Sequence, residues 1–275
     1  MGCILSLLPG SASTVTQVNN SKPTLAVSPD SMSESSKQQW RAARPDYPIG
    51  VPSKFDPEGN VQPFPGNTIV AHLAPASPLY ASMLDLYNKL ASHPLSSLYA
   101  LLPPPSWHMT VFEGVCDQVR GPGYWPRDLP PSDSPSSTTT LEACTALFAQ
   151  KLADFDLQCD PPFRLTVTGF TSLAVGIGVR LQLRTPKEEA RFRGLRDRLA
   201  EVLQIRHPHH DNYLLHLSMT YFVRYPTPEQ AAELTALLAE HFEGMPKEFE
   251  LGAPEFCTFE NMFKFDRSFY LKNRE

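Results

Sequence analysis

The sequence has little that would place it among disulfide-bonded, secreted or membrane-spanning proteins. Its 275 residues include only five cysteines. These are widely spaced with no Cys-x-x-Cys pair, so we expect no zinc or redox motif of that kind and a reducing, cytoplasmic compartment. No apolar run approaches the roughly 18 residues that cross a bilayer. The short stretch from Ile4 to Leu8 lacks the basic flank and the length of a secretory signal.

Basic charge is also scarce. The chain has 24 Lys and Arg against 29 Asp and Glu, a formal net charge of −5. A protein that coats duplex nucleic acid must neutralise many phosphates, so we expect no duplex partner. A small phosphorylated ligand stays compatible with this balance. The 41% hydrophobic content is enough to bury the core of one large domain or of a domain built from two similar halves.

The ends of the chain differ in composition. Residues 1–45 are rich in Ser, Pro, Asn and Gln and predict a disordered tail, whereas residues 46–275 predict a single domain with a Pro- and Ser-rich connection at 117–140. The first six residues fit the myristoylation pattern at Gly2, with Cys3 placed for a palmitoyl chain. Acylation would give contact with a membrane through this end. The alternative is a chance match to a short pattern.

Hydroxyl residues followed by proline mark three helix starts, and a fourth start is predicted at Thr139. The predicted helices cover residues 78–91, 140–155, 186–204 and 228–243. Residues rich in β-formers lie between them, at 67–74, 107–115, 163–170, 173–183, 214–224 and 247–265. The order is strand, helix, strand, helix, strand, and then the same again.

This repetition indicates a duplicated unit. One constant offset of 108 residues relates Pro78 to Pro186, His108 to His216, and Thr110 to Ser218. Two similar lobes that face each other would bring both histidine segments to one central cleft.

The histidine segments carry the candidate chemistry. Each has the form H-x-[ST]-h, where h is apolar: His108 with Thr110, and His216 with Ser218. Residues two apart in a strand point to the same face, so two imidazoles and two hydroxyls would line the cleft. A neutral imidazole can remove a proton while a charged one donates a proton, and the hydroxyls can hold phosphate oxygens. Either histidine alone would be read as a hydrogen-bonded core residue, but two matches at one offset favour a paired site.

The surrounding sequence resembles the two-histidine (2H) phosphoesterase superfamily, which includes bacterial 2′-5′ RNA ligase-like proteins and cyclic nucleotide phosphodiesterases. The resemblance covers about residues 50–266, and the segments 67–73, 77–80 and 107–110 resemble more particularly the branch named domain of unknown function 1868. It implies a duplicated, two-lobed α+β fold in which each lobe is a mainly antiparallel sheet with helices on its outer face. The active site would lie in the central cleft.

The resemblance also implies an activity: opening or forming a 2′,3′-cyclic or 2′-5′ phosphodiester of an RNA end or a nucleotide. We expect this reaction to need no metal or cofactor, and we expect the protein to be a monomer. Its catalytic set would be His108, Thr110, His216 and Ser218. Family members often carry Arg or Tyr five residues after the second histidine, which makes Tyr221 a candidate substrate-binding residue. Strand parity, however, predicts that Tyr221 points away from the cleft.

The same offset pairs His72 with Arg180 as further substrate-binding candidates. Arg180 shares a predicted strand face with Gly176 and Gly178, whose missing side chains would let a ligand approach the guanidinium. The alternative for Arg180 is an exposed arginine on a solvated strand. For His72, in an apolar run, it is a buried structural histidine.

Two other functions stay open. A metallohydrolase could use His207, His209 and Asp211, which nearly match a metal-binding run, although a solvated loop also explains them. The domain could instead be a module that binds a nucleotide without turning it over. In the connection, Tyr124 and Trp125 could stack on a base or simply anchor the loop.

Overall fold

The computed structural model describes residues 45–129 and 139–274. The chain divides into two units, Met1–Arg44 and Pro45–Glu275, and every described residue belongs to the second. The predicted disordered tail and the acylation candidates Gly2 and Cys3 lie outside the described residues. Among the described residues, no helix has both the length and the apolar character needed to cross a bilayer.

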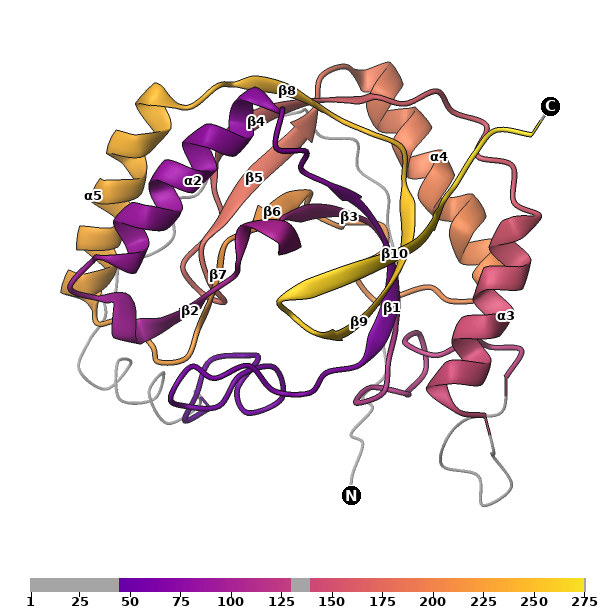
Figure 1. The fold of residues 1–275 in the computed structure, drawn as a ribbon, viewed down its shortest axis with the longest axis horizontal. Coiled ribbons are helices and arrows are strands. Elements are labelled where there is room, and N and C mark those ends of the chain that lie inside the picture. Colours follow the sequence, from indigo (N-terminus) through magenta and orange to yellow (C-terminus); the bar gives the residue numbers. More distant parts are fainter. Residues whose placement is uncertain (1–44, 130–138, 275) are drawn as a thin grey trace, which may run out of the picture. The chain divides into compact units, whose positions relative to one another are not determined.

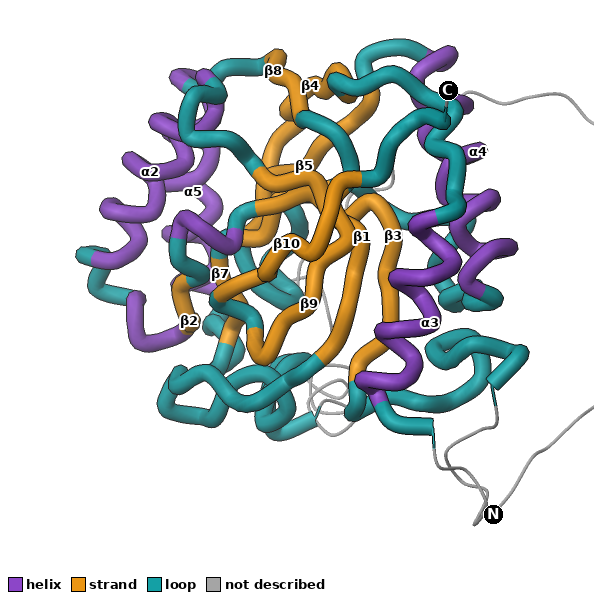
Figure 2. The backbone as a smooth tube through the Cα atoms, turned by 45° about the vertical axis from the view of Figure 1, so that its right-hand side comes forward, coloured by secondary structure: helices purple, strands orange, loops and turns teal. Residues whose placement is uncertain are grey.

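An antiparallel sheet runs through the domain (Figures 1 and 2). Within the described residues it has eight strands in the order β10-β9-β1-β3-β6-β5-β4-β8, and a separate two-stranded sheet pairs β2 with β7. The strands are β1 (Gly66–His72), β2 (Tyr99–Leu101), β3 (His108–Cys116), β4 (Phe163–Phe170), β5 (Gly178–Leu183), β6 (His216–Ser218), β7 (Thr220–Phe222), β8 (Glu248–Leu251), β9 (Glu255–Asn261) and β10 (Lys264–Tyr270). The sheet therefore consists of two four-stranded halves that meet between β3 and β6.

Four helices of the described residues agree with the sequence expectation: α2 (Pro78–Ala91), α3 (Leu141–Ala153), α4 (Pro186–Leu203) and α5 (Pro228–Gly244). They lie in two pairs, α2 beside α5 and α3 beside α4 (Figures 1 and 2). Thr227 caps α5 in a complete capping box. Ser77 stands at the start of α2 but makes no side-chain cap hydrogen bond. The α3 cap is Thr140, one residue after the predicted Thr139.

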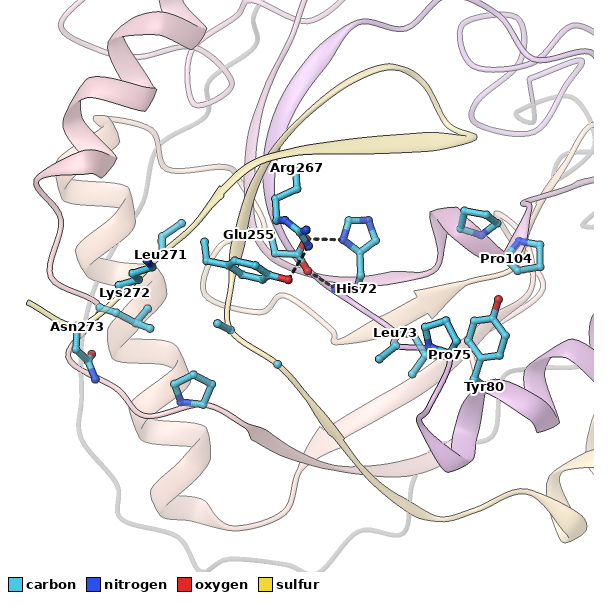
Figure 3. A pocket seen from close by; sticks show the side chains of 17 residues that line it. His72, Leu73, Pro75, Tyr80, Pro104, Glu255, Arg267, Leu271, Lys272 and Asn273 are labelled. Carbon is cyan, nitrogen blue, oxygen red and sulfur yellow. Dashed lines mark hydrogen bonds and ion pairs between the residues drawn. The ribbon is translucent and has the colours of Figure 1, made fainter.

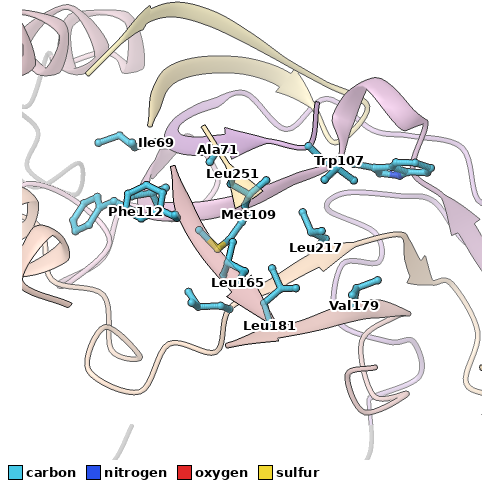
Figure 4. Packing of buried hydrophobic residues seen from close by; sticks show 14 of the residues in the cluster. Ile69, Ala71, Trp107, Met109, Phe112, Leu165, Val179, Leu181, Leu217 and Leu251 are labelled. Carbon is cyan, nitrogen blue, oxygen red and sulfur yellow. The ribbon is translucent and has the colours of Figure 1, made fainter. Parts of the chain in front are cut away.

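The core lies between the helices and one face of the sheet. Met109 and Leu217 (Figure 4) are fully buried, as is Val111. All three join one apolar cluster with helix residues such as Leu79 and Phe192. The residues between them, including the motif histidines, are only partly buried. This alternation follows from strand geometry, so the helices cover one face and leave the motif face free. The structure confirms the predicted α+β class and the antiparallel sheet.

The sequence boundaries were wrong in two strand regions. The run at 173–183 forms a strand only from Gly178, and Val175, which precedes the strand, is 43% exposed. The single run expected at 247–265 is β8, β9 and the start of β10. The short strand β2 and most of β10 were not expected. Their pairing partners are β7 and β9, which shows that tertiary pairing determines these strands.

Candidate functional site

The two motif strands lie side by side where the halves of the sheet meet. β3 and β6 are antiparallel, with Met109 directly opposite Leu217. It follows that His108 stands across from Ser218, and Thr110 across from His216. Each imidazole therefore lies next to the hydroxyl of the other motif, an arrangement with approximate twofold symmetry.

Both imidazoles are held in the same way. Nδ1 of His108 lies 2.7 Å from the carbonyl oxygen of Ser106, and Nδ1 of His216 lies 2.8 Å from that of Leu214. A carbonyl can only accept, so Nδ1 is the donor in each ring. When either ring is neutral, its Nε2 therefore carries a free lone pair.

All four motif side chains line one cavity of about 410 Å³. The loop before β1 and the turn between β9 and β10 complete its wall. Its other lining residues include Phe64, Asn67, Thr68, Glu113, Gly114, Tyr124, His207, Tyr213, Phe259, Met262 and Phe265. This cavity corresponds to the cleft that the duplicated pattern predicted.

His108 is the more enclosed of the two imidazoles. The ring of Phe265 packs at 4.2 Å and the ring of His72 at 5.9 Å from it, centroid to centroid. Burial, together with the nearby His72 and His216, lowers the pKa of His108 to about 3, although the hydrogen bond to Ser106 acts in the opposite direction. His108 is therefore neutral near pH 7 and able to accept a proton.

The cavity is also lined by a cation, Lys54, which was not predicted from the sequence. No other Lys or Arg occurs among the described residues that line the cavity. The ammonium of Lys54 donates to the hydroxyl of Tyr221 at 3.1 Å and lies 4.8 Å from the centre of that ring and 5.2 Å from the ring of Phe64. Lys54 lies far in sequence from either motif, and no local pattern marks it. An ammonium at this position can pair with a phosphate.

Tyr221 lines the cavity, so the prediction that it points away was wrong. The reason is an irregularity between β6 and β7. The amides of Met219 and Thr220 both donate to the carbonyl of Ile177, and both residues are buried. Two consecutive residues on one side change the alternation by one position, as in a β-bulge. Tyr221 therefore points to the same face as His216.

Arg180 is not among the residues that line this cavity. It stands opposite His216 on β5, as His72 stands opposite His108 on β1, but its guanidinium donates to the side-chain and backbone oxygens of Thr168. The space beside the two glycines was also misread. A Cβ at Gly176 would lie 2.0 Å from the backbone oxygen of Thr220, and one at Gly178 would lie 3.2 Å from that of Leu217. The neighbouring strand, not a ligand, fills this space.

His72 stands opposite His108 on β1. Its Nδ1 lies 3.0 Å from a carboxylate oxygen of Glu255, and its side chain is 23% exposed. It lines a second cavity beside the first and not the cavity of the motif residues. The structure thus brings His72 next to the site without placing it inside.

Tyr213 lines the cavity and contacts both motifs. Its ring is 6.0 Å from that of His216, and its hydroxyl lies near the side chain of Thr110. Burial and the nearby Glu113 raise the pKa of Tyr213 above its ordinary range. The guanidinium of the buried Arg196 lies 4.4 Å from the ring, and it donates to the carbonyl of Val111 at 2.7 Å. These contacts tie α4 to the back of β3.

The residues of the alternative metal site, His207, His209 and Asp211, do not form a cluster. Nε2 of His207 contacts the carbonyl of Gly114, and His209 is exposed. Two other groups of metal-type side chains occur among the described residues: Asp197, His210 and Asp211, and His72, Glu255 and Cys257. In the first, Arg206 already pairs with both carboxylates. Neither group contains a motif residue.

Tyr124 and Trp125, the two neighbouring aromatic residues of the connection, lie in different surroundings. Tyr124 lines the cavity, with its ring 5.1 Å from that of His207. Trp125 is buried beneath the guanidinium of Arg120, 4.4 Å away. Tyr124 is thus placed where it can meet a ligand, whereas Trp125 anchors the loop.

Known proteins resemble this chain in sequence and in fold. The family model described as 2H-phosphodiest, domain of unknown function (DUF1868), matches residues 54–176. A solved protein from Agrobacterium tumefaciens str. C58, the conserved protein of unknown function ATU0111, is 30% identical, with 84% of this chain and 95% of that chain covered and a TM-score of 0.74. The chain belongs to the 2H phosphoesterase superfamily.

Within this 2H protein, the family match includes the first motif and ends before the second. Escherichia coli LigT, solved in complex with ATP, aligns at 10% identity with a TM-score of 0.36, over 72% of this chain and 88% of that chain. The comparison with curated proteins finds no match. Membership of the superfamily indicates a phosphoesterase, while the substrate has to be argued from the site itself.

Proposed function

We propose that this chain opens a 2′,3′-cyclic phosphodiester at an RNA end or on a nucleotide, by paired-histidine acid–base catalysis. One observation carries the proposal. Two imidazoles with the same Nδ1 hydrogen bond stand on adjacent strands, each beside the hydroxyl of the other motif, at one cavity. A binder needs donors for phosphate, but it needs no matched acid and base.

The surroundings of the rings support one division of roles between the two histidines. His108 is neutral because burial lowers its pKa to about 3, so its Nε2 accepts the proton of a water molecule. The water oxygen forms a bond to phosphorus while the bond from phosphorus to one ribose oxygen breaks. His216 gives its proton to that oxygen, which leaves a phosphomonoester beside a free hydroxyl. The reverse sequence of the same steps would form the diester.

The remaining groups hold the phosphate. The hydroxyls of Thr110 and Ser218 donate to its non-bridging oxygens, where negative charge increases in the transition state. The ammonium of Lys54 and the hydroxyl of Tyr221, which are hydrogen-bonded to each other, stand at the same cavity and can meet the phosphate charge or the ribose. None of these roles calls for a metal ion.

Product analysis tests the proposal. The purified chain is incubated with a 2′,3′-cyclic nucleotide, with and without a chelator, and the products are separated by chromatography. We expect a phosphomonoester in both samples at equal rates. Binding without turnover would instead support a nucleotide-binding module. Activity that the chelator abolishes and that requires stoichiometric zinc would support a metallohydrolase.

A further inference from the structure

The second cavity is larger than the one with the motif residues. It measures about 910 Å³, within the range of roughly 300–1,000 Å³ that ligand sites occupy. It begins beyond the end of β1 and is closed by the segment that follows β8 and by the end of the chain after β10. Its walls are largely apolar and include Leu73, Pro75, Pro104, Pro105, Pro161 and Leu271 (Figure 3).

The two cavities are neighbours. His72 lines the large cavity, and its ring packs against that of His108 at 5.9 Å between centroids. Pro104 and Pro105 line the large cavity, and the next residue, Ser106, lines the small one and holds Nδ1 of His108. A ligand that bridges them would pass this contact between His72 and His108.

One end of the large cavity is polar and carries unused donors. Glu255, with a side chain that is 6% exposed, pairs with Nδ1 of His72 at 3.0 Å and with Nη1 of Arg267 at 3.2 Å. Burial alone would raise the pKa of Glu255, but the hydrogen bonds from His72 and Arg267 hold it below its ordinary value. The carboxylate is therefore charged and already occupied. It orients the two side chains that flank it (Figure 3).

Arg267 keeps spare hydrogen-bonding capacity. Nη1 also donates to the hydroxyl of Tyr270 at 2.6 Å, and the guanidinium stacks on that ring at 4.3 Å. No described residue hydrogen-bonds to its Nε or Nη2. Exposed Lys272 adds an ammonium at the same cavity. A planar guanidinium with two nitrogens free to donate suits a phosphate, and the ammonium of Lys272 adds positive charge at the same cavity.

We infer that the large cavity binds a second nucleotide of the substrate, its phosphate at Arg267 and Lys272 and its base between the apolar walls. This inference rests on the proposed function. It deepens that function, because it makes the substrate a strand end of at least two nucleotides. The ring of Tyr80, which packs on Trp107 at 5.4 Å, supplies an aromatic wall for the base.

Two substrates with the same terminal base test the inference: a 2′,3′-cyclic mononucleotide, and a dinucleotide that ends in a 2′,3′-cyclic phosphate. We expect the wild-type kcat/KM to be at least ~10-fold higher for the dinucleotide, because contacts to a charged group add affinity. The variant Arg267→Gln should bring the ratio of the two kcat/KM values close to one. Arg164→Gln is the matched control, since this guanidinium on β4 pairs with Glu250 outside the cavity, and it should keep the wild-type ratio.

Thermal unfolding shows whether Arg267→Gln is folded. If it is not, Lys272→Gln replaces it, because this exposed side chain has no partner to lose among the described residues, and the ratio should again fall. A wild-type ratio near one, or a ratio that neither variant lowers, would overturn the inference and leave the proposed function standing. Absence of hydrolysis with both substrates would overturn the proposed function, and the inference with it.

Discussion

The two motif histidines receive the same backbone hydrogen bond, but their surroundings differ. His108 lies against the rings of Phe265 and His72, whereas His216 is the more exposed ring and lies beside Tyr213. The H-x-[ST]-h pattern predicts both residues and the face on which they lie. It cannot predict which imidazole is buried, because Phe265 comes from a strand about 150 residues further along the chain.

The burial of His108 predicts how stability depends on pH. Its pKa is about 3 in the folded protein against an ordinary 6.5, so between these values the unfolded chain binds a proton at this ring and the folded chain does not. Stability therefore rises with pH through this window and is lost as the pH falls from about 6.5, by at most ~1.4 kcal/mol per pH unit. Urea unfolding from about pH 6.5 to about pH 4.5 measures it. His108→Gln should show a shallower loss, and parallel curves for the two proteins would refute the assignment.

Lys54 supplies a second prediction at the residue scale. The variant Lys54→Met removes the ammonium and keeps most of the chain length, and we expect KM for a cyclic nucleotide to rise about 10-fold because a cation that pairs with the phosphate is lost. Lys264→Met, on the exposed face of β10, is the control and should not change KM. Steady-state kinetics measure KM for both variants. Equal KM values for Lys54→Met and wild type would show that Lys54 does not bind the phosphate.

Elements were predicted well wherever the signal was local. Thr227 and Gln230 cap α5 as the sequence indicates, and Thr185 accepts the amide of Glu188 at the start of α4. The irregularity between β6 and β7 was missed because alternation was assumed to continue from His216 to Tyr221. It depends on contacts with Ile177 across the sheet, which no local pattern contains.

The close packing at this irregularity predicts that adding one methyl group, in the variant Gly176→Ala, destabilises the protein. The Cβ of Gly176→Ala would lie 2.0 Å from the backbone oxygen of Thr220, so the strand would have to move. We expect a loss of at least ~2 kcal/mol in the free energy of unfolding. Gly244→Ala, at a position with no atom within 4 Å of the added Cβ, should change it by less than about 1 kcal/mol. Denaturant titration of both variants checks this, and equal values would show that the bulge tolerates the clash.

At the scale of the whole domain, the constant offset of 108 residues correctly predicted that the two motif segments meet at the centre of the domain. It relates β3 to β6 and β1 to β5, and these strands occupy equivalent places on either side of the centre of the sheet. It could not show that β9 lies beside β1, or that β8 lies beside β4, because each of these pairings joins strands far apart in the chain. Lys54 and the end of β10 reach their cavities in the same way, through contacts between distant segments. That is why these residues were not predicted.

The turnover of a 2′,3′-cyclic nucleotide by the single variants His108→Ala and His216→Ala tests the central claim most directly. Each variant should stay folded, as circular dichroism would show, and each should lose at least ~100-fold in kcat, because each removes one of the two proton transfers. A variant of either histidine that is folded and fully active would contradict the paired mechanism.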